Sequence, residues 1–376
     1  MPHWVTAWGY QPLDFTRFPM QPAGKTLRIR FPVNVRGTRV RVRLTNRYGT
    51  APIHLERVMV CCGSAHGSLT LHGTVPITLE PGQEADSDAL PLPVSPGDTV
   101  VLELHSAADA QFTTGGSVFP QSYTSAHLLP LENTVPTGLL DIEPEHQAFF
   151  GVCRMEVETE DPVRTICFFG DSITHRSLWT GPLTKRIAEQ RPGLVTTFNS
   201  GISGNRICYD ASPFTPFGGW MGQTAYQRLK KDVFFDENVR IVTVLLGTND
   251  IFHPLAGFTP PEQTADPAAM IDGLSRIAAQ IHAHGAKAVG CTITPWKNCQ
   301  GRFAAAPEAV RRAVNDWIRR TDCYDLVLDF DEMLADPTDS ERMLPCYDGS
   351  DHVHPGPAGG AHMAACIPID RLLALL

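Results

Sequence analysis

The hydrophobic periodicity of this chain changes near residue 160, and no other feature constrains the fold as strongly. Before that point, short runs alternate between apolar and polar residues, with turns rich in Pro and Gly between them, as in 26–31, 39–44 and 99–104. Strict alternation places the apolar side chains on one face of a strand, which predicts packed antiparallel sheets. We therefore expect residues 1–160 to form an all-β sandwich of the jelly-roll kind.

A different pattern follows the acidic, Pro-containing segment 158–162, where strand-like runs alternate with helical ones. The expected strands are 165–169, 195–198, 239–246, 286–293 and 325–330, and the clearest helices are 178–190, 267–284, 305–320 and 357–367. Alternating strands and helices indicate βαβ units, in which a parallel sheet is covered by helices on both faces. The sequence therefore predicts a second, α/β domain over residues 163–376.

Length and composition agree with two compact domains and exclude several functions. A chain of 376 residues exceeds what one hydrophobic core usually organises. Its net charge of −9 argues against binding of nucleic acid or of an anionic membrane surface, since both need clustered Lys and Arg. No stretch approaches the ~18 apolar residues of a membrane span. The N-terminus lacks a basic segment followed by an apolar one. We expect a cytoplasmic protein, unless a leader has been removed, and the sequence leaves its oligomeric state open.

The cysteine and histidine residues do not indicate a metal site or another cofactor. The ten cysteines are scattered without a Cys-x-x-Cys motif, which argues against zinc and against a small disulfide scaffold. Histidines occur in pairs at His282 and His284 and at His352 and His354, but no further ligands follow at a recognisable spacing. The sequence thus predicts a protein without metal or cofactor.

Polar motifs follow several of the expected strands of the second domain. Parallel α/β sheets bind ligands beyond the carboxyl ends of their strands. The first strand is followed by Gly170-Asp171-Ser172, the second by 199–205 with Ser203-Gly204-Asn205, and the third by Gly247-Thr248-Asn249-Asp250. Beyond the last strand lies the segment 348–355, with Asp351, His354 and Pro355. A hydroxyl, backbone donors, an amide, an imidazole and a carboxylate are therefore expected at one edge of the sheet.

These groups are the ones that acyl transfer from an ester requires. Ser172 would attack the ester, and His354 would take its proton and later return it to the leaving alcohol. Asp351 would orient the imidazole, because Pro355 keeps the turn from becoming helical and lets both side chains point the same way. The N–H groups of Ser172 and Gly204 and the side-chain amide of Asn249 would hold the oxyanion.

The four motifs, in this order and with these separations, resemble those of the SGNH hydrolases, also called GDSL esterases and lipases. The resemblance implies a flavodoxin-like, three-layer α/β/α domain with about five parallel strands over 163–376. It also implies that Ser172 is the nucleophile, that Asp351 and His354 complete the triad, and that Gly204 and Asn249 are oxyanion donors. His352 stands where the family often has a small residue, and it leaves a second imidazole whose role stays open.

The first half of the chain is similar to the β-rich partner domain of two-domain bacterial members of the same family. The similarity lies in the segments 4–9 and 41–49. These segments consist mostly of alternation and turns, features that many β-sandwiches share. Whether this domain contributes to the active site is not decided by the sequence.

The substrate is less constrained than the chemistry. We expect a serine esterase that removes a short acyl group, acetyl above all, from a carbohydrate or another small polar ester. Three loops rich in aromatic residues and Pro, at 209–220, 252–261 and 295–303, are natural substrate walls, and Trp220 and Trp296 could stack on a sugar or line an acyl pocket. These aromatic residues could equally hold their own loops in place. A lysophospholipase or thioesterase for longer chains, and a non-catalytic carbohydrate-binding protein, remain as alternatives.

Overall fold

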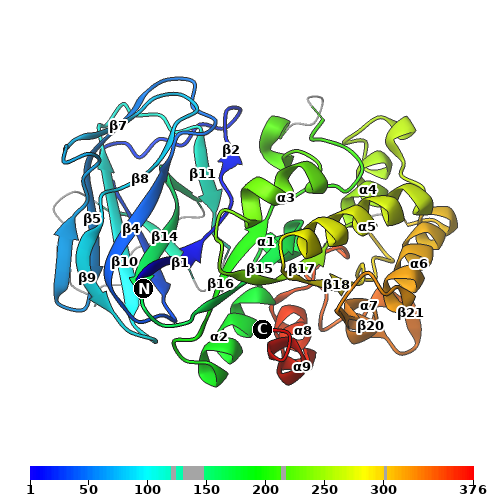
Figure 1. Ribbon diagram of the computed structural model, residues 1–376. Helices are drawn as coiled ribbons and strands as arrows, with labels where there is room; N and C mark the ends of the chain where they lie inside the picture. The colour runs from blue at the N-terminus through cyan, green and yellow to red at the C-terminus, as the bar shows by residue number, and fades with distance from the viewer. Residues whose placement is uncertain (120–123, 130–147, 213–216, 300–302) are drawn as a thin grey trace. The chain divides into compact units, whose positions relative to one another are not determined.

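The computed structural model describes residues 1–119, 124–129, 148–212, 217–299 and 303–376. They divide into two compact units, coloured along the chain in Figure 1. One consists of Met1–Thr165 and Ile187–Phe198, the other of Ile166–Arg186 and Asn199–Leu376. Residues 213–216 and 300–302, which belong to two of the aromatic loops expected near the site, lie outside the described residues.

The N-terminal part of the chain is built from antiparallel strands. One sheet has the order β1-β14-β4-β8, with β9 beside β4, and a second has the order β12-β3-β10-β5-β6, with β7 beside β5. A shorter third sheet has the order β13-β11-β2. The strands are β1 (His3–Gly9), β2 (Leu13–Asp14), β3 (Thr26–Pro32), β4 (Gly37–Thr45), β5 (Ile53–Cys62), β6 (Ala65–Ser68), β7 (Ile77–Leu79), β8 (Glu84–Asp86), β9 (Leu90–Val94), β10 (Thr99–Ser106), β11 (Thr114–Ser117), β12 (Ser125–Leu129), β13 (Ala148–Phe150) and β14 (Val152–Thr159).

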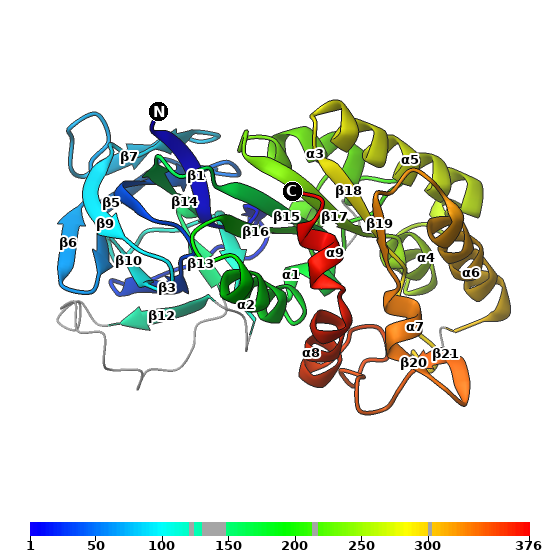
Figure 2. The same cartoon turned by 60° about the horizontal axis from the view of Figure 1, so that its bottom comes forward.

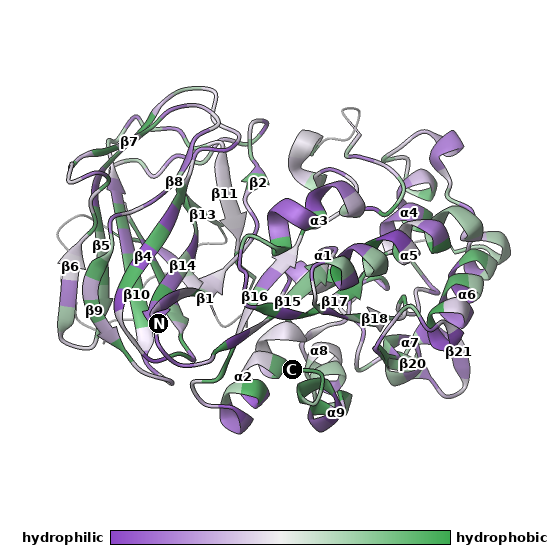
Figure 3. Ribbon diagram, in the orientation of Figure 1, coloured by the Kyte–Doolittle hydropathy of each residue, from purple (hydrophilic) through white to green (hydrophobic). Residues whose placement is uncertain are grey.

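Alternation along the strands explains how the two larger sheets pack. In β4, Val40, Val42 and Leu44 are fully buried and join residues of the second sheet, such as Leu102, in one hydrophobic core. On the other face of β4, Arg41 lies opposite Glu156 of β14, with 2.6 Å between Arg Nε and Glu Oε2. Figure 3 shows the same alternation as bands of hydrophilic and hydrophobic colour along these strands. The expected antiparallel β-rich region is confirmed.

The C-terminal part contains a parallel sheet of five strands, β16-β15-β17-β18-β19. They are β15 (Arg164–Gly170), β16 (Val195–Gly201), β17 (Val239–Leu245), β18 (Lys287–Cys291) and β19 (Leu326–Leu328). Numbered within this sheet, the order is 2-1-3-4-5, the flavodoxin-like arrangement that the sequence predicted. The order reverses between β15 and β17, and ligands bind at such a switch point. A small hairpin follows, formed by β20 (Ala335–Asp336) and β21 (Asp339–Met343).

Helices cover both faces of this sheet, with α3 and α5 on one face and α8 and α9 on the other (Figures 1 and 2). The helices are α1 (Ser172–His175), α2 (Thr180–Gln190), α3 (Ala225–Val233), α4 (Thr248–Leu255), α5 (Pro267–Ala283), α6 (Ala305–Arg320), α7 (Phe330–Leu334), α8 (Pro357–Cys366) and α9 (Ile369–Leu373), with 3₁₀ turns η2 (Gly218–Met221) and η3 (Pro261–Gln263). None of the helices in the described ranges is long and apolar enough to cross a membrane.

Two helices differ from the sequence-based expectation. Helix α3 was not expected, and α4 occupies the start of the segment 252–261 that was expected to be a loop. Pro254 lies in the last turn of α4, where its ring interrupts few helical hydrogen bonds, so the preceding residues remain helical. The side chain of Asn249 therefore projects from the first turn of a helix and not from a loop.

Candidate active site

Ser172 lies where β15 ends and α1 begins. The side chain of Asp171 caps the helix, since its Oδ1 accepts the N–H of Ile173 at 3.0 Å. A side chain at Gly170 would place its Cβ 2.4 Å from Thr174 Oγ1 and 2.6 Å from Leu245 O, so the turn needs a glycine there. The resulting sharp turn leaves Ser172 at the first position of a helix, only 8 % exposed.

The structure brings Ser172, His354 and Asp351 into one hydrogen-bonded chain. Ser172 Oγ lies 2.7 Å from His354 Nε2, although the two residues are 182 positions apart in sequence. On the other side of the ring, His354 Nδ1 lies 2.7 Å from Asp351 Oδ2. With Nδ1 protonated and donating to the carboxylate, Nε2 has a free lone pair directed at the serine hydroxyl. This geometry allows the imidazole to take the proton of Ser172.

The Asp351 carboxylate is held by its own turn. Its Oδ1 accepts the N–H groups of His354 at 2.8 Å and Val353 at 3.0 Å. Burial raises the pKa of Asp351. The hydrogen bond and charge of His354, together with these N–H groups, lower the pKa by more than burial raises it, so it lies well below its usual value. Arg176, at the end of α1, adds a cation 3.8 Å from Oδ2. The carboxylate therefore stays ionised beside the imidazole.

His352 does not share this arrangement. Its Nδ1 contacts Asp348 Oδ2, and its N–H donates to Asp348 Oδ1 at 3.1 Å. The backbone of His352 is left-handed, with φ at +61°, which directs its side chain differently from that of His354. The loop thus contains two Asp–His pairs, and the one formed by Asp351 and His354 is the one that contacts Ser172.

Two of the three residues expected to donate to an oxyanion, Gly204 and Asn249, are joined through Asn205. Gly204 has φ at +82°, and a Cβ on it would lie 2.5 Å from Met221 Cγ, so only glycine fits there without strain. Asn249, in the first turn of α4, donates from Nδ2 to the backbone oxygen of Asn205 at 3.0 Å. The amide is therefore held next to the Gly204-Asn205 segment, while its second N–H is not used by this bond.

Two buried carboxyl groups support these turns. Asp250 accepts the N–H groups of Ile207 and Cys208, both at 2.9 Å, and so fixes the segment that follows Asn205. Burial raises the pKa of Asp250, while those N–H groups and Arg206 oppose the rise. Asp171 is 1 % exposed, and its burial raises its pKa to about 7. The hydrogen bond from the N–H of Ile173 lowers this pKa, and the charge of Asp250 raises it.

The raised pKa of Asp171 predicts a pH-dependent stability. Between its usual pKa and about 7, the folded protein binds a proton at Asp171 that the unfolded chain has lost, so stability falls as pH rises through this window. Asp171→Asn keeps an acceptor for the Ile173 N–H and cannot ionise. We measure the unfolding free energies of this variant and of the parent with urea. We expect the difference, variant minus parent, to increase by up to about 4 kcal/mol from pH 4 to pH 8. A difference between the two proteins that stays constant with pH would contradict this assignment.

The two tryptophans proposed for substrate binding differ in their surroundings. Trp296 is 3 % exposed and donates its indole N–H to Glu308 Oε2 at 2.9 Å. Its burial and this hydrogen bond favour the alternative that Trp296 holds its own loop, and its role in stacking on a sugar or lining an acyl pocket stays a prediction. Trp220, in η2, is half-buried and stays a prediction.

Phenylalanines link the loops that follow the second and third motifs. Phe217 and Phe258 meet edge to face with ring centroids 6.1 Å apart, and Phe252 lies 6.2 Å from Phe258. Phe217 and Leu255 are among the few large apolar side chains that remain exposed. An apolar surface thus adjoins the motifs that carry Gly204 and Asn249.

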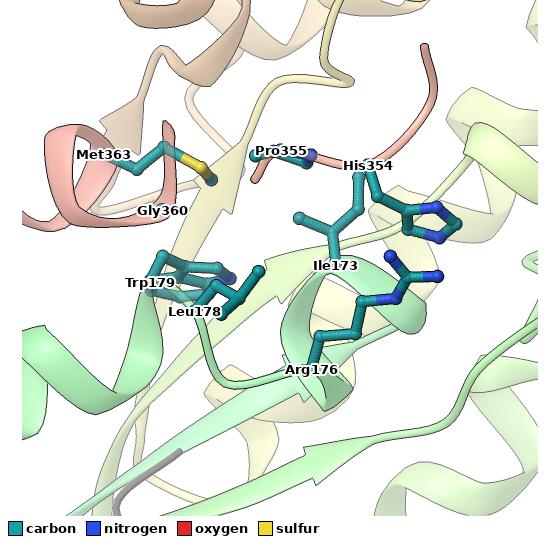
Figure 4. A pocket seen from close by; sticks show the side chains of 8 residues that line it. All are labelled: Ile173, Arg176, Leu178, Trp179, His354, Pro355, Gly360 and Met363. Atoms are coloured by element: carbon teal, nitrogen blue, oxygen red, sulfur yellow. The ribbon is translucent and has the colours of Figure 1, made fainter. Parts of the chain in front are cut away.

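A hollow too narrow for a water molecule lies beside His354 (Figure 4). The rings of His354 and Pro355 and the guanidinium of Arg176 lie on one side of it, and the side chain of Met363 lies on the other. The remaining lining residues are Ile173, Leu178, Trp179 and Gly360. The hollow is therefore mainly apolar and has one cationic side chain at its edge.

Sequence reasoning missed several polar residues near the motifs. Arg176 lies four positions after Ser172, a helical spacing that could have revealed it, and Ser203 Oγ is 2.9 Å from His175 Nδ1. Arg228 contacts two motifs from α3, a helix that was not expected. Within the described residues, no group of three or more His, Cys, Asp or Glu side chains gathers in a way that could hold a metal ion.

Comparison with known proteins identifies the family. Residues 168–362 match the model of the GDSL-like Lipase/Acylhydrolase family, so the chain belongs to this family. It is a carboxylic ester hydrolase of the GDSL type, as the sequence predicted. No curated protein matches the chain.

The solved structures to which this chain is similar include a GDSL-like lipase from Bacteroides thetaiotaomicron, at 19 % identity and a TM-score of 0.40, covering 56 % of this chain and 89 % of that one. Another is an acetylxylan esterase from Geobacillus stearothermophilus, at 16 % identity and a TM-score of 0.42, covering 57 % of this chain and 94 % of that one.

Proposed function

We propose that this protein is a serine esterase that removes short acyl groups, with acetyl preferred, from a carbohydrate or another small polar ester. The observation that carries the proposal is the hydrogen-bonded chain from Ser172 Oγ through His354 to Asp351, with 2.7 Å at each step. An aligned hydroxyl, imidazole and carboxylate make up the machinery of nucleophilic acyl transfer.

The reaction follows from the positions of these groups. Ser172 Oγ attacks the ester carbonyl as its proton passes to His354 Nε2, and Asp351 stabilises the imidazolium. The N–H groups of Ser172 and Gly204 and the amide of Asn249 receive the oxyanion, and each such donor contributes about 2.7–4 kcal/mol to transition-state stabilisation. His354 then protonates the leaving alcohol, and water repeats the sequence to release the acid and restore Ser172.

The hollow beside His354 favours a short acyl group over a long one. It is too narrow for a water molecule, so a long acyl chain has no channel to enter there. The exposed Phe217, its partner Phe258 and the half-buried Trp220 provide apolar surface on which the rings of a sugar could pack. A small acyl group on a ring-bearing polar alcohol fits both observations.

Hydrolysis of matched esters tests the acyl preference. We expect p-nitrophenyl acetate to be hydrolysed with a kcat/KM at least about tenfold above that of the decanoate, because the hollow beside His354 has no room for the longer chain. Acetylated monosaccharides and oligosaccharides should release acetate in the same assay. Faster turnover of the decanoate would overturn the short-chain assignment in favour of a longer-chain lipase.

Covalent labelling tests the nucleophile independently of the substrate. A fluorophosphonate probe should attach to Ser172, and the label should disappear in Ser172→Ala. The matched control is Ser203→Ala, which removes a hydroxyl that lies 2.9 Å from His175 Nδ1 and should leave labelling intact. A folded parent protein that takes no label would refute the esterase mechanism.

A further inference from the structure

The guanidinium of Arg228 connects the first two motifs of the site. Arg228 lies in α3 and is 4 % exposed. Its Nη2 donates to the backbone oxygen of Gly170 at 2.9 Å, its Nη1 to that of Ser200 at 3.0 Å, and its Nε to Asn205 Oδ1 at 2.8 Å. One side chain thus binds the end of β15, the end of β16 and the loop that follows it.

Two of these contacts, at Gly170 and Asn205, lie one or two residues from a group with a proposed role. The Gly170 carbonyl belongs to the peptide that enters Asp171, directly before Ser172. Asn205 follows Gly204, and its backbone oxygen accepts the amide of Asn249 at 3.0 Å. The guanidinium therefore contacts the turn that carries Ser172. It also contacts Asn205, which in turn adjoins the other two proposed oxyanion donors, Gly204 and Asn249.

The guanidinium of an arginine suits this task, although burying its charge costs free energy. A planar guanidinium offers five donors in a rigid fork, whereas the ammonium of lysine is a single compact donor centre on a flexible stem. Burying the cation is unfavourable unless it is paired and hydrogen-bonded. Asp232, one turn later in α3, lies 3.3 Å from Nη1, and the guanidinium carbon lies 4.0 Å from the centre of the Phe169 ring.

We propose that Arg228 is a positioning residue for ester hydrolysis, which fixes the oxyanion donors Gly204 and Asn249 relative to Ser172. This inference rests on the esterase function proposed above. Loss of the fork keeps the side chains of Ser172 and His354 but lets the turn at Gly170 and the Gly204–Asn205 segment move relative to each other. Oxyanion contacts strengthen in the transition state, so the loss lowers kcat more than it raises KM.

A second buried arginine provides the matched control. Arg311, in α6, is 2 % exposed, contacts Glu308 and Asp331, and donates to the backbone oxygen of Ile293 at 3.0 Å. Like Arg228, it joins an acid of its own helix to a strand-end carbonyl. It contacts none of the four motifs, so Arg311→Lys reproduces the loss of stability without the loss of positioning.

The test compares kcat and KM of Arg228→Lys and Arg311→Lys with acetyl esters, each rate divided by the concentration of sites that react with the fluorophosphonate at completion. We expect Arg228→Lys to lower kcat by about 10- to 100-fold with KM within about twofold of the parent value. Arg311→Lys should retain the parent kcat per reactive site. Equal kcat losses in both variants, or no loss in Arg228→Lys, would overturn the proposal.

Asn205→Ala keeps the test decisive if Arg228→Lys does not fold. It removes the Nε partner of Arg228, together with the bonds from Asn205 Nδ2 to the backbone oxygens of Met221 at 2.9 Å and Gln223 at 2.8 Å. The guanidinium bonds to Gly170 and Ser200 remain, so the variant should lower kcat at nearly constant KM. If both variants fold, the double variant should be as active as the less active of the two single variants, because the two side chains act as one unit. Additive losses would refute this coupling. An inactive parent protein would refute the esterase function itself. An active parent protein with an equally active Arg228→Lys variant would refute only the positioning role of Arg228.

Discussion

His354→Ala is expected to lower kcat for acetyl ester hydrolysis by about 10⁶-fold, the size of loss that follows removal of the base from a serine hydrolase triad. The imidazole is the group 2.7 Å from Ser172 Oγ, and without it the hydroxyl has no proton acceptor. The measurement is kcat of the purified variant, with the parent protein mixed in at known trace levels to set the limit of detection.

His352→Ala is the matched control for this loss. The substitution removes an imidazole two residues away that also contacts an aspartate, yet contacts Asp348 and not Ser172. Its kcat should stay within a few-fold of the parent value. If His352→Ala were inactive while His354→Ala hydrolysed the ester, the assignment of the base would be wrong.

Asp351→Asn is expected to lower kcat by about 10⁴-fold while the protein keeps its fold. The Asn oxygen can still accept the N–H groups of Val353 and His354, so the turn survives. The new amide, however, donates toward His354 Nδ1, which stabilises the tautomer with the proton on Nε2. The imidazole then has no lone pair for the proton of Ser172.

The neighbouring pair again provides a control for Asp351→Asn. Asp348→Asn changes the carboxylate that contacts His352. It keeps an acceptor for the N–H of Ser350, which lies 2.9 Å from Asp348 Oδ1 in the parent protein. We expect its kcat to remain near that of the parent protein. Comparable losses in the two variants would indicate that the loop, and not the tautomer of His354, limits the reaction.

The sequence predicted the fold well where hydrophobic periodicity is strong. The change near residue 160 separated antiparallel from parallel architecture, and the strand at 165–169 corresponds to β15 (Arg164–Gly170). Ser172, His354 and Asp351 could be proposed because short motifs at strand ends meet at one edge of a parallel sheet. That rule needs no knowledge of side-chain packing, so it can be applied to the residues alone.

Features that depend on packing could not be predicted in the same way. Helix α3 is short and carries several Lys and Arg residues, and Arg228 is buried only because its hydrogen-bond acceptors come from two strands and a loop. Trp296 appeared suited to a substrate wall, but the position of Glu308 on α6 turns its indole N–H into the protein. The sequence indicated His354 as the base, but the position of His352 beside Asp348 depends on the backbone conformation of the loop, which spacing does not reveal.

The separation of 182 residues between Ser172 and His354 has a consequence for the chain as it is being synthesised. Proteins emerge from the ribosome N-terminus first, and domains can begin to fold as they emerge. The proposed nucleophile Ser172 and the proposed oxyanion donors Gly204 and Asn249 are made long before Asp351 and His354. The hydrogen-bonded chain from Ser172 to Asp351 can therefore form only after the polypeptide has been extended beyond His354.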